Sequence, residues 1–96
     1  MKKFENKETK IQQGDTKLRY SDLIGICLTH VNPQSGIKAD EMYKNFKILD
    51  KLEAATTEIE LEDAEYDLVL SKVTNMSWAM QHRDIVAFVE AIKQAK

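Results

Sequence analysis

The sequence predicts a mainly α-helical domain, a compact bundle of about four short helices. Apolar residues recur every three or four positions in four segments, which is the helical period. Pro33 and Gly36 mark the clearest break between two of these segments. The chain of 96 residues is 43% hydrophobic, enough for one packed core. We divide it into a flexible basic arm, residues 1–17, and a single helical domain, residues 18–96.

Each predicted helix has its own apolar stripe. The helices are expected at residues 21–31, 38–55, 62–76 and 82–95. Ser21 is the expected N-cap of the first helix, because its hydroxyl can accept a hydrogen bond from a free backbone N–H. In the second helix the expected buried stripe is Met42, Phe46, Leu49 and Leu52.

Two short segments alternate polar and apolar residues, which is typical of strands. They are residues 17–20 and residues 57–61. We expect them to pair as a minor two-stranded ribbon, with Lys17 and Arg19 facing glutamates. Residues 1–17 contain only three apolar side chains, so the arm is expected to remain flexible.

Charge is distributed unevenly along the chain. Residues 1–20 carry six bases and three acids, whereas residues 53–67 carry seven acids and no base. The net charge is only −2, so no global basic field favours nucleic acid. The basic arm and the acidic segment are expected to attract each other, within one chain or between copies.

No residue pattern indicates an enzyme, a metal centre or a cofactor site. Cys27 and His30 have the spacing of two zinc ligands, but a closed site needs four ligands and Cys27 lies on an apolar stripe. The triplet at 82–84 spells the H-R-D of kinases, yet Val89 stands where that motif requires asparagine. We therefore expect no catalytic, metal-binding or cofactor-binding residue.

The residues expected to bind a partner protein come from four parts of the chain. They are the acids Glu58, Glu60, Glu62, Asp63 and Glu65, the aromatic residues Trp78 and Tyr43, and the arm residues Lys2 and Lys3. Trp78 lies between Met76 and Met80, a soft apolar cluster of the kind used at interfaces. The alternative that Trp78 only fills the gap between two helices stays open, and is the favoured one.

Several short motifs resemble small accessory proteins of tailed phages and prophages. They are Glu41-Met42, Ile48-Leu49-Asp50-Lys51-Leu52-Glu53, Leu61-Glu62-Asp63-Ala64, Met76-Ser77-Trp78 and His82-Arg83-Asp84-Ile85-Val86-Ala87-Phe88-Val89. The resemblance covers residues 20–95 and leaves the lysine-rich arm outside. It implies no catalytic residue, and it implies a phage protein that acts by binding another protein.

The leading hypothesis is a non-enzymatic accessory protein of phage or prophage origin that occupies a partner's surface. Its role would be virion assembly or inhibition of a host or defence protein. One alternative is a homo-oligomeric assembly protein whose arm docks on the acidic segment of the next copy. Another is a DNA-associated regulator that uses the lysine-rich arm, although nucleic-acid binding is disfavoured by the interspersed acids. With one cysteine and no apolar run of membrane-spanning length, we expect a bacterial cytoplasmic location, with virion association as an option, and no membrane partner.

Overall fold

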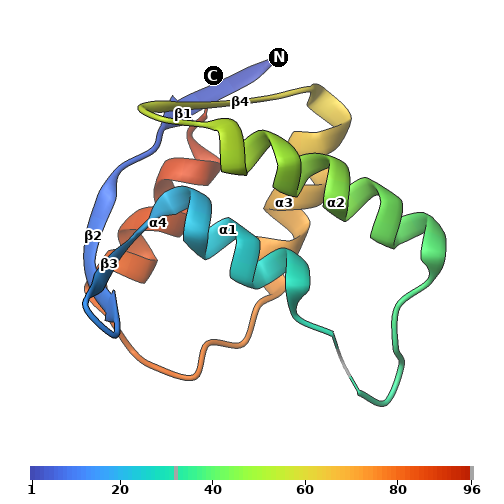
Figure 1. The fold of residues 1–96 in the computed structure, drawn as a ribbon, viewed down its shortest axis with the longest axis horizontal. Coiled ribbons are helices and arrows are strands. Elements are labelled where there is room, and N and C mark those ends of the chain that lie inside the picture. Colours follow the sequence, from blue (N-terminus) through green and yellow to red (C-terminus); the bar gives the residue numbers. More distant parts are fainter. Residues whose placement is uncertain (32, 96) are drawn as a thin grey trace.

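The computed structural model describes residues 1–31 and 33–95 and has a mixed α/β architecture (Figure 1). Its elements are β1 (Lys2–Glu5), β2 (Glu8–Gln13), β3 (Thr16–Arg19), α1 (Tyr20–Thr29), α2 (Ala39–Ala54), β4 (Glu58–Leu61), α3 (Asp63–Asn75) and α4 (Arg83–Lys93). The chain is 53% helical and 19% strand, with two small antiparallel sheets. The predicted mainly helical bundle is therefore wrong as a fold class, although the four helices lie within two residues of their predicted bounds.

The predicted flexible arm is also wrong, because residues 1–17 supply strands β1 and β2 and the start of β3. Phe4 in β1 and Ile11 in β2 are both buried in the core. Each strand buries alternate side chains and leaves their neighbours in solvent, the pattern of a half-covered strand. The small number of apolar residues does not predict these strands. One buried apolar side chain per strand is enough to hold the strand on the core when strand pairing satisfies the backbone hydrogen bonds.

The predicted ribbon between residues 17–20 and 57–61 does not form. Strand β3 pairs instead with β2, through a two-residue turn in which Gly14 has a φ of +66°. Strand β4 pairs with β1, with Lys3 opposite Glu60 and Glu5 opposite Glu58. A hairpin between adjacent strands closes a much shorter loop than the predicted pairing, so its entropic cost is lower.

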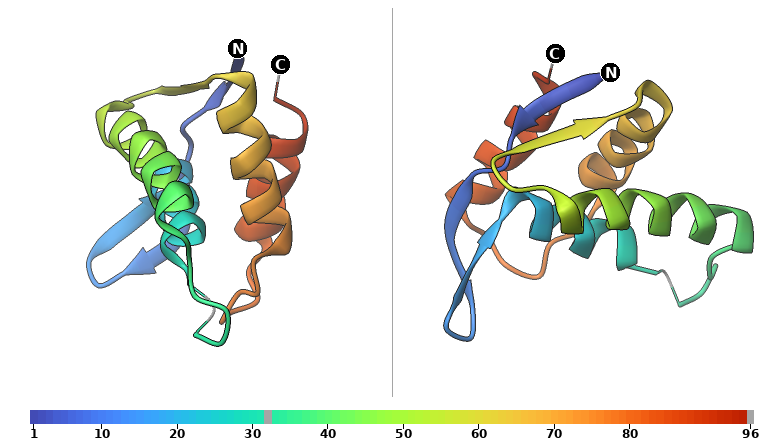
Figure 2. Two further views of the ribbon diagram at one scale, coloured as in Figure 1. Left: turned by 90° about the vertical axis from the view of Figure 1, so that its right-hand side faces the viewer. Right: turned by 45° about the horizontal axis from the view of Figure 1, so that its top comes forward.

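The helices pack around one core, with the two sheets at its edge. Helix α1 contacts both α2 and α3, and α4 packs against α3. Figure 2 shows the β1–β4 sheet lying across one end of the helices, while the β2–β3 hairpin flanks α1 and α4. Tyr20 and Phe88 meet in the core with ring centroids 5.2 Å apart. The hydroxyl of Tyr66 donates to the carbonyl of Ile92 at 2.6 Å and joins α3 to α4.

Helix α2 buries a different side from the one that its apolar stripe predicts. Of the predicted stripe, Leu52 is buried and Leu49 is half-buried, whereas Met42 and Phe46 are exposed. Asn45 and Ile48 complete the buried side instead. The helix has apolar residues on two sides, and the core covers only one of these sides. Met42 and Phe46 lie on the side that the core leaves uncovered.

Candidate functional site

The predicted acidic surface is largely engaged within the chain. Glu60 Oε1 lies 3.5 Å from Lys3 Nζ, and Asp63 Oδ1 lies 3.2 Å from the N-terminal ammonium. Glu65 Oε1 accepts a hydrogen bond from Lys51 Nζ at 2.5 Å. The attraction between the arm and the acidic segment thus operates inside one molecule and helps to hold β1 on β4.

Glu62 and Glu65 also serve the fold locally. The backbone N–H of Glu62 donates to Glu65 Oε1 at 2.9 Å, which is half of a capping box at the start of α3. Burial raises the pKa of Glu65, but its hydrogen bonds from Lys51 and from the Glu62 backbone outweigh burial and lower the pKa below its usual value. A side chain held in this way is a poor candidate for contact with a partner.

Glu58 and Lys2 complete the predicted acidic and basic set. Glu58 is exposed and has Glu5 as its cross-strand neighbour. Lys2 Nζ lies 5.6 Å from the centroid of the Tyr66 ring, a cation–π distance. Of the predicted charged residues, Glu58 is the one that is neither paired nor capping within the chain that the structure describes.

Trp78 is half-buried between α3 and α4. Its ring meets Phe88 edge-on, with centroids 6.3 Å apart and an interplanar angle of 90°. It also lines a cavity of about 270 Å³ together with Ile85, Val86 and Val89. Trp78 therefore packs on the core with one part of its ring and borders a surface hollow with the rest.

Tyr43 lies in solvent on α2, and its neighbour Phe46 was not predicted to join it there. Tyr43 is 76% exposed and Phe46 is 61% exposed. Three further apolar side chains near them are partly exposed: Met42 on α2, Ile26 on α1, and Val31 just after α1. We call these five exposed residues the apolar face; Val31, Met42 and Phe46 among them border one common hollow. Sequence analysis missed this face because it assigned Met42 and Phe46 to the core.

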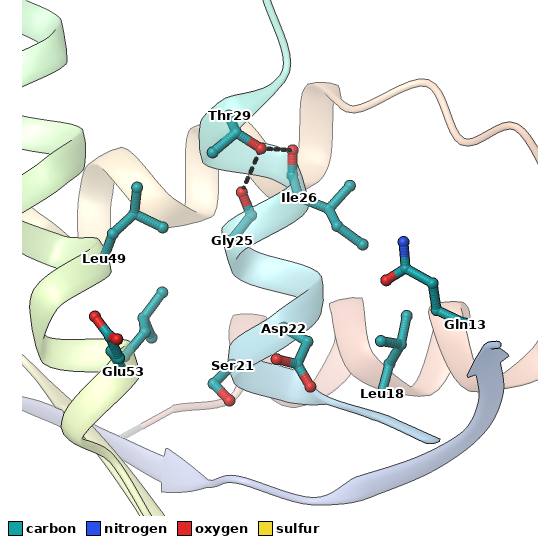
Figure 3. A pocket seen from close by; sticks show the side chains of 10 residues that line it. Gln13, Leu18, Ser21, Asp22, Gly25, Ile26, Thr29, Leu49 and Glu53 are labelled. Carbon is teal, nitrogen blue, oxygen red and sulfur yellow. Dashed lines mark hydrogen bonds between the residues drawn. The ribbon is translucent and has the colours of Figure 1, made fainter. Parts of the chain in front are cut away.

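The surface of α1 between α2 and the β2–β3 hairpin forms a shallow trough (Figure 3). Gly25 and Ile26 lie on its floor, and Leu49 and Glu53 of α2 stand on one side. Its volume is about 440 Å³. We call this hollow the α1 trough. A second cavity of about 200 Å³ adjoins it and shares Thr29 and Leu49.

The second cavity has mainly apolar walls, with Thr29 and Asn45 as its polar residues. Leu28, Val31, Ile37, Met42 and Phe46 line it together with Asn45. Asn45 is only 4% exposed, and its Nδ2 donates to the Leu28 carbonyl at 3.3 Å. Its Oδ1 is buried and has no hydrogen-bond partner within the described chain. Buried acceptors are rarely left unpaired, so this one requires an explanation.

The candidate catalytic and metal-binding groups do not form a reactive site. Burial raises the pKa of the Cys27 thiol to about 12. His30 and Cys27 border one common hollow, but His82 instead caps α4, where its Nδ1 accepts from the Asp84 N–H at 3.0 Å. Within residues 1–31 and 33–95, no three Cys, His, Asp or Glu side chains are grouped to hold a metal ion.

No protein-family model, curated protein or solved structure matches the chain. Among the described residues, no helix combines the length and apolar character that a membrane span requires. The function is therefore inferred from the side chains of this chain, above all from the apolar face and the α1 trough.

Proposed function

We propose that this chain is a non-enzymatic accessory protein of phage or prophage origin that occupies the surface of a partner protein. Its partner is a virion component during assembly or a host protein that it inhibits. The observation that carries the proposal is the exposure of Tyr43 and Phe46 on α2. Phe46 borders a hollow that adjoins the α1 trough at Thr29 and Leu49.

The energetics of Phe46 support this role. Burying a phenylalanine side chain is worth about 1.5–3 kcal/mol, and this chain forgoes most of that stabilisation at Phe46. Single exposed apolar residues need no explanation, but a contiguous apolar patch indicates an interaction site. Tyrosine in particular is enriched among the residues that dominate binding energy.

The chemistry of the titratable groups also favours binding over catalysis. The thiol of Cys27 is buried and protonated, since its pKa is about 12. Glu65, the carboxyl group whose pKa is lowered, is held by Lys51. Neither Cys27 nor Glu65 lines the α1 trough, so neither group could act on a molecule bound there.

The proposal is tested by replacing Tyr43 or Phe46 with a photo-crosslinking phenylalanine in the host bacterium. Both positions should crosslink to the same discrete protein, because both belong to the apolar face. Asp67, which is exposed on α3, is the control position and should give no such product. Equal crosslinking at all three positions, or none at 43 and 46, would contradict the proposal.

A second candidate is a homo-oligomer in which β1 of one copy pairs with β4 of the next. This candidate is supported by the pairing of β1 with β4, a register of four residue pairs in which Lys3 lies opposite Glu60. Exchange of such a segment between identical chains reuses the same contacts. Deleting residues 1–5 should then lower the solution mass to that of one truncated chain, which is below the 11.1 kDa of the full chain. The DNA-associated alternative has less support, because Lys2 and Lys3 already have partners within the chain.

A further inference from the structure

Resting on the proposed function, we infer that the α1 trough binds an amphipathic helix of the partner protein. The apolar stripe of that helix lies over Gly25 and against Phe46 and Leu49. A lysine or arginine at one end of the stripe lies between Asp22 and Glu53. Three observations support this occupant: the charge at the two ends, the glycine on the floor of the trough, and the length of the α2 side.

The α1 trough and the cavity that adjoins it are together apolar at one end and acidic at the other. Val31, Met42 and Phe46 border the adjoining cavity of about 200 Å³, which shares Thr29 and Leu49 with the trough. At the other end Asp22 and Glu53 line the trough from α1 and α2 (Figure 3). Asp22 accepts the Arg19 backbone N–H at 2.8 Å, and neither carboxylate has an ion-pair partner in the part of the chain that is described. An apolar ligand with a cation at one end matches this layout.

Gly25 makes close approach of a helix feasible. It lies in the middle of α1, where glycine is less stable than alanine. The chain's own packing does not require it: an added Cβ would lie 3.6 Å from Leu49 Cδ2, an ordinary contact. Its φ is not in the left-handed region either, because only Gly14 and Gly36 are. The absent side chain therefore lowers the floor for a crossing backbone.

The dimensions favour a helix of about three turns. Along α2, Met42 borders the adjoining cavity and Glu53 borders the trough, and the eleven residue steps between them span about 16 Å. Helices commonly bind in grooves through apolar residues spaced at i, i+3, i+4 and i+7.

A second copy of this chain is a poorer occupant. A two-fold contact centred on the trough would place Asp22 and Glu53 against the partner copy's apolar end. Burying carboxylates without cations is strongly unfavourable.

The probe that we choose is a displayed library of 16-residue helices. All members carry a leucine stripe, and the residues at both ends and one stripe position are randomised. Selected helices should carry lysine or arginine at one end only. They should bind at least tenfold more weakly to Phe46→Glu and to Gly25→Leu. A selection repeated on the protein that carries both Asp22→Asn and Glu53→Gln should no longer enrich basic residues at one end.

Val86→Glu is the matched control, because Val86 is 64% exposed on α4, away from the trough. It should leave binding of the selected helices unchanged. Thermal unfolding checks that each variant is folded, and Asp22→Asn with Glu53→Gln keeps the test decisive if Gly25→Leu is not.

Three results would overturn the inference: no helix selected above background, no enrichment of basic residues at one end, or equal binding to Phe46→Glu. A dimer mass that Phe46→Glu abolishes would assign the trough to a second copy instead, and would overturn it as well. Crosslinking of a partner at positions 43 and 46 is independent of these outcomes. If it succeeds while the helix selection fails, the proposed function stands and the inference about its ligand falls.

Discussion

The side-chain Oδ1 of Asn6 accepts a hydrogen bond from the backbone N–H of Ser21 at 2.9 Å. The same carboxamide donates through Nδ2 to the Thr56 carbonyl at 3.1 Å, and the Asn6 backbone N–H donates to the Thr57 carbonyl at 2.9 Å. Asn6 is 6% exposed. A single residue between β1 and β2 thus connects the start of α1 to the segment that leads into β4, which explains why the N-terminal residues are part of the fold.

Replacing Asn6 with alanine should destabilise the protein by about 1–3 kcal/mol, because it leaves the Ser21 N–H and the Thr56 carbonyl without partners. Urea unfolding monitored by circular dichroism measures the change. Alanine at the exposed neighbour Lys7 is the control and should change stability by less than about 0.5 kcal/mol. Equal effects of the two substitutions would show that the Asn6 bridge contributes nothing.

Substituting Gly25 with alanine should stabilise the fold by about 0.5–1 kcal/mol, since the helix gains propensity and the new methyl group has room. Gly14→Ala should have the opposite sign, because Gly14 has a φ of +66° at the tip of the β2–β3 hairpin. Both changes are measured by urea unfolding. A destabilised Gly25→Ala protein would mean that the chain's own packing requires this glycine.

Charge reversal on β4 should have opposite effects at two positions. Glu58→Lys replaces a like-charge pair with Glu5 by an attractive one, and should stabilise by about 0.2–1 kcal/mol. Glu60→Lys places a second cation opposite Lys3 and should destabilise by a similar amount. Both effects should shrink in 1 M salt. Thermal unfolding of the two variants at low and high salt is the measurement, and shifts of the same sign would rule out the register-based explanation.

Glu65 makes the stability depend on pH. Because its pKa is lower in the folded chain than the usual value of about 4.3, its contribution is complete above that value. The contribution is lost as the pH falls through the folded pKa. Glu65→Gln should therefore be less stable than the natural protein at pH 7, and the gap should close in acid. Unfolding free energies of both proteins between pH 7 and pH 2 test this, and a gap that is constant across the range would contradict it.

The Cys27 thiol should resist modification in the folded protein, because it is buried and its pKa is about 12. Labelling with a thiol-reactive disulfide at pH 8 should proceed only as fast as the protein opens, and should accelerate with urea. Ser77→Cys places a thiol at an exposed position and serves as the control for unhindered reaction. Equal rates at positions 27 and 77 in the absence of urea would mean that the core around α1 is open.

The sequence alone determined where the helices lie, because helical periodicity and helix ends depend on residues close together in the chain. It also marked Tyr43 as an exposed aromatic residue. It did not reveal which side of α2 is buried. Met42, Phe46, Leu49 and Leu52 have the spacing of a core stripe, but Leu52 is buried together with Ile48 and Asn45, and Met42 and Phe46 are exposed. An excess of apolar positions on α2 and a glycine in the middle of α1 were the signals available in the sequence.

Strand pairing and the trough were decided by the tertiary structure. The β1–β4 pair joins residues more than fifty positions apart, and short strands carry too few residues to specify a partner by pattern. Asn6 fixes that arrangement through hydrogen bonds to segments that only the folded chain brings together. The trough arises in the same way, since Glu53 becomes a neighbour of Asp22 and Gly25 only after α1 and α2 pack. Local spacing sets each helix, but the contacts between elements set which side chains remain available to a partner.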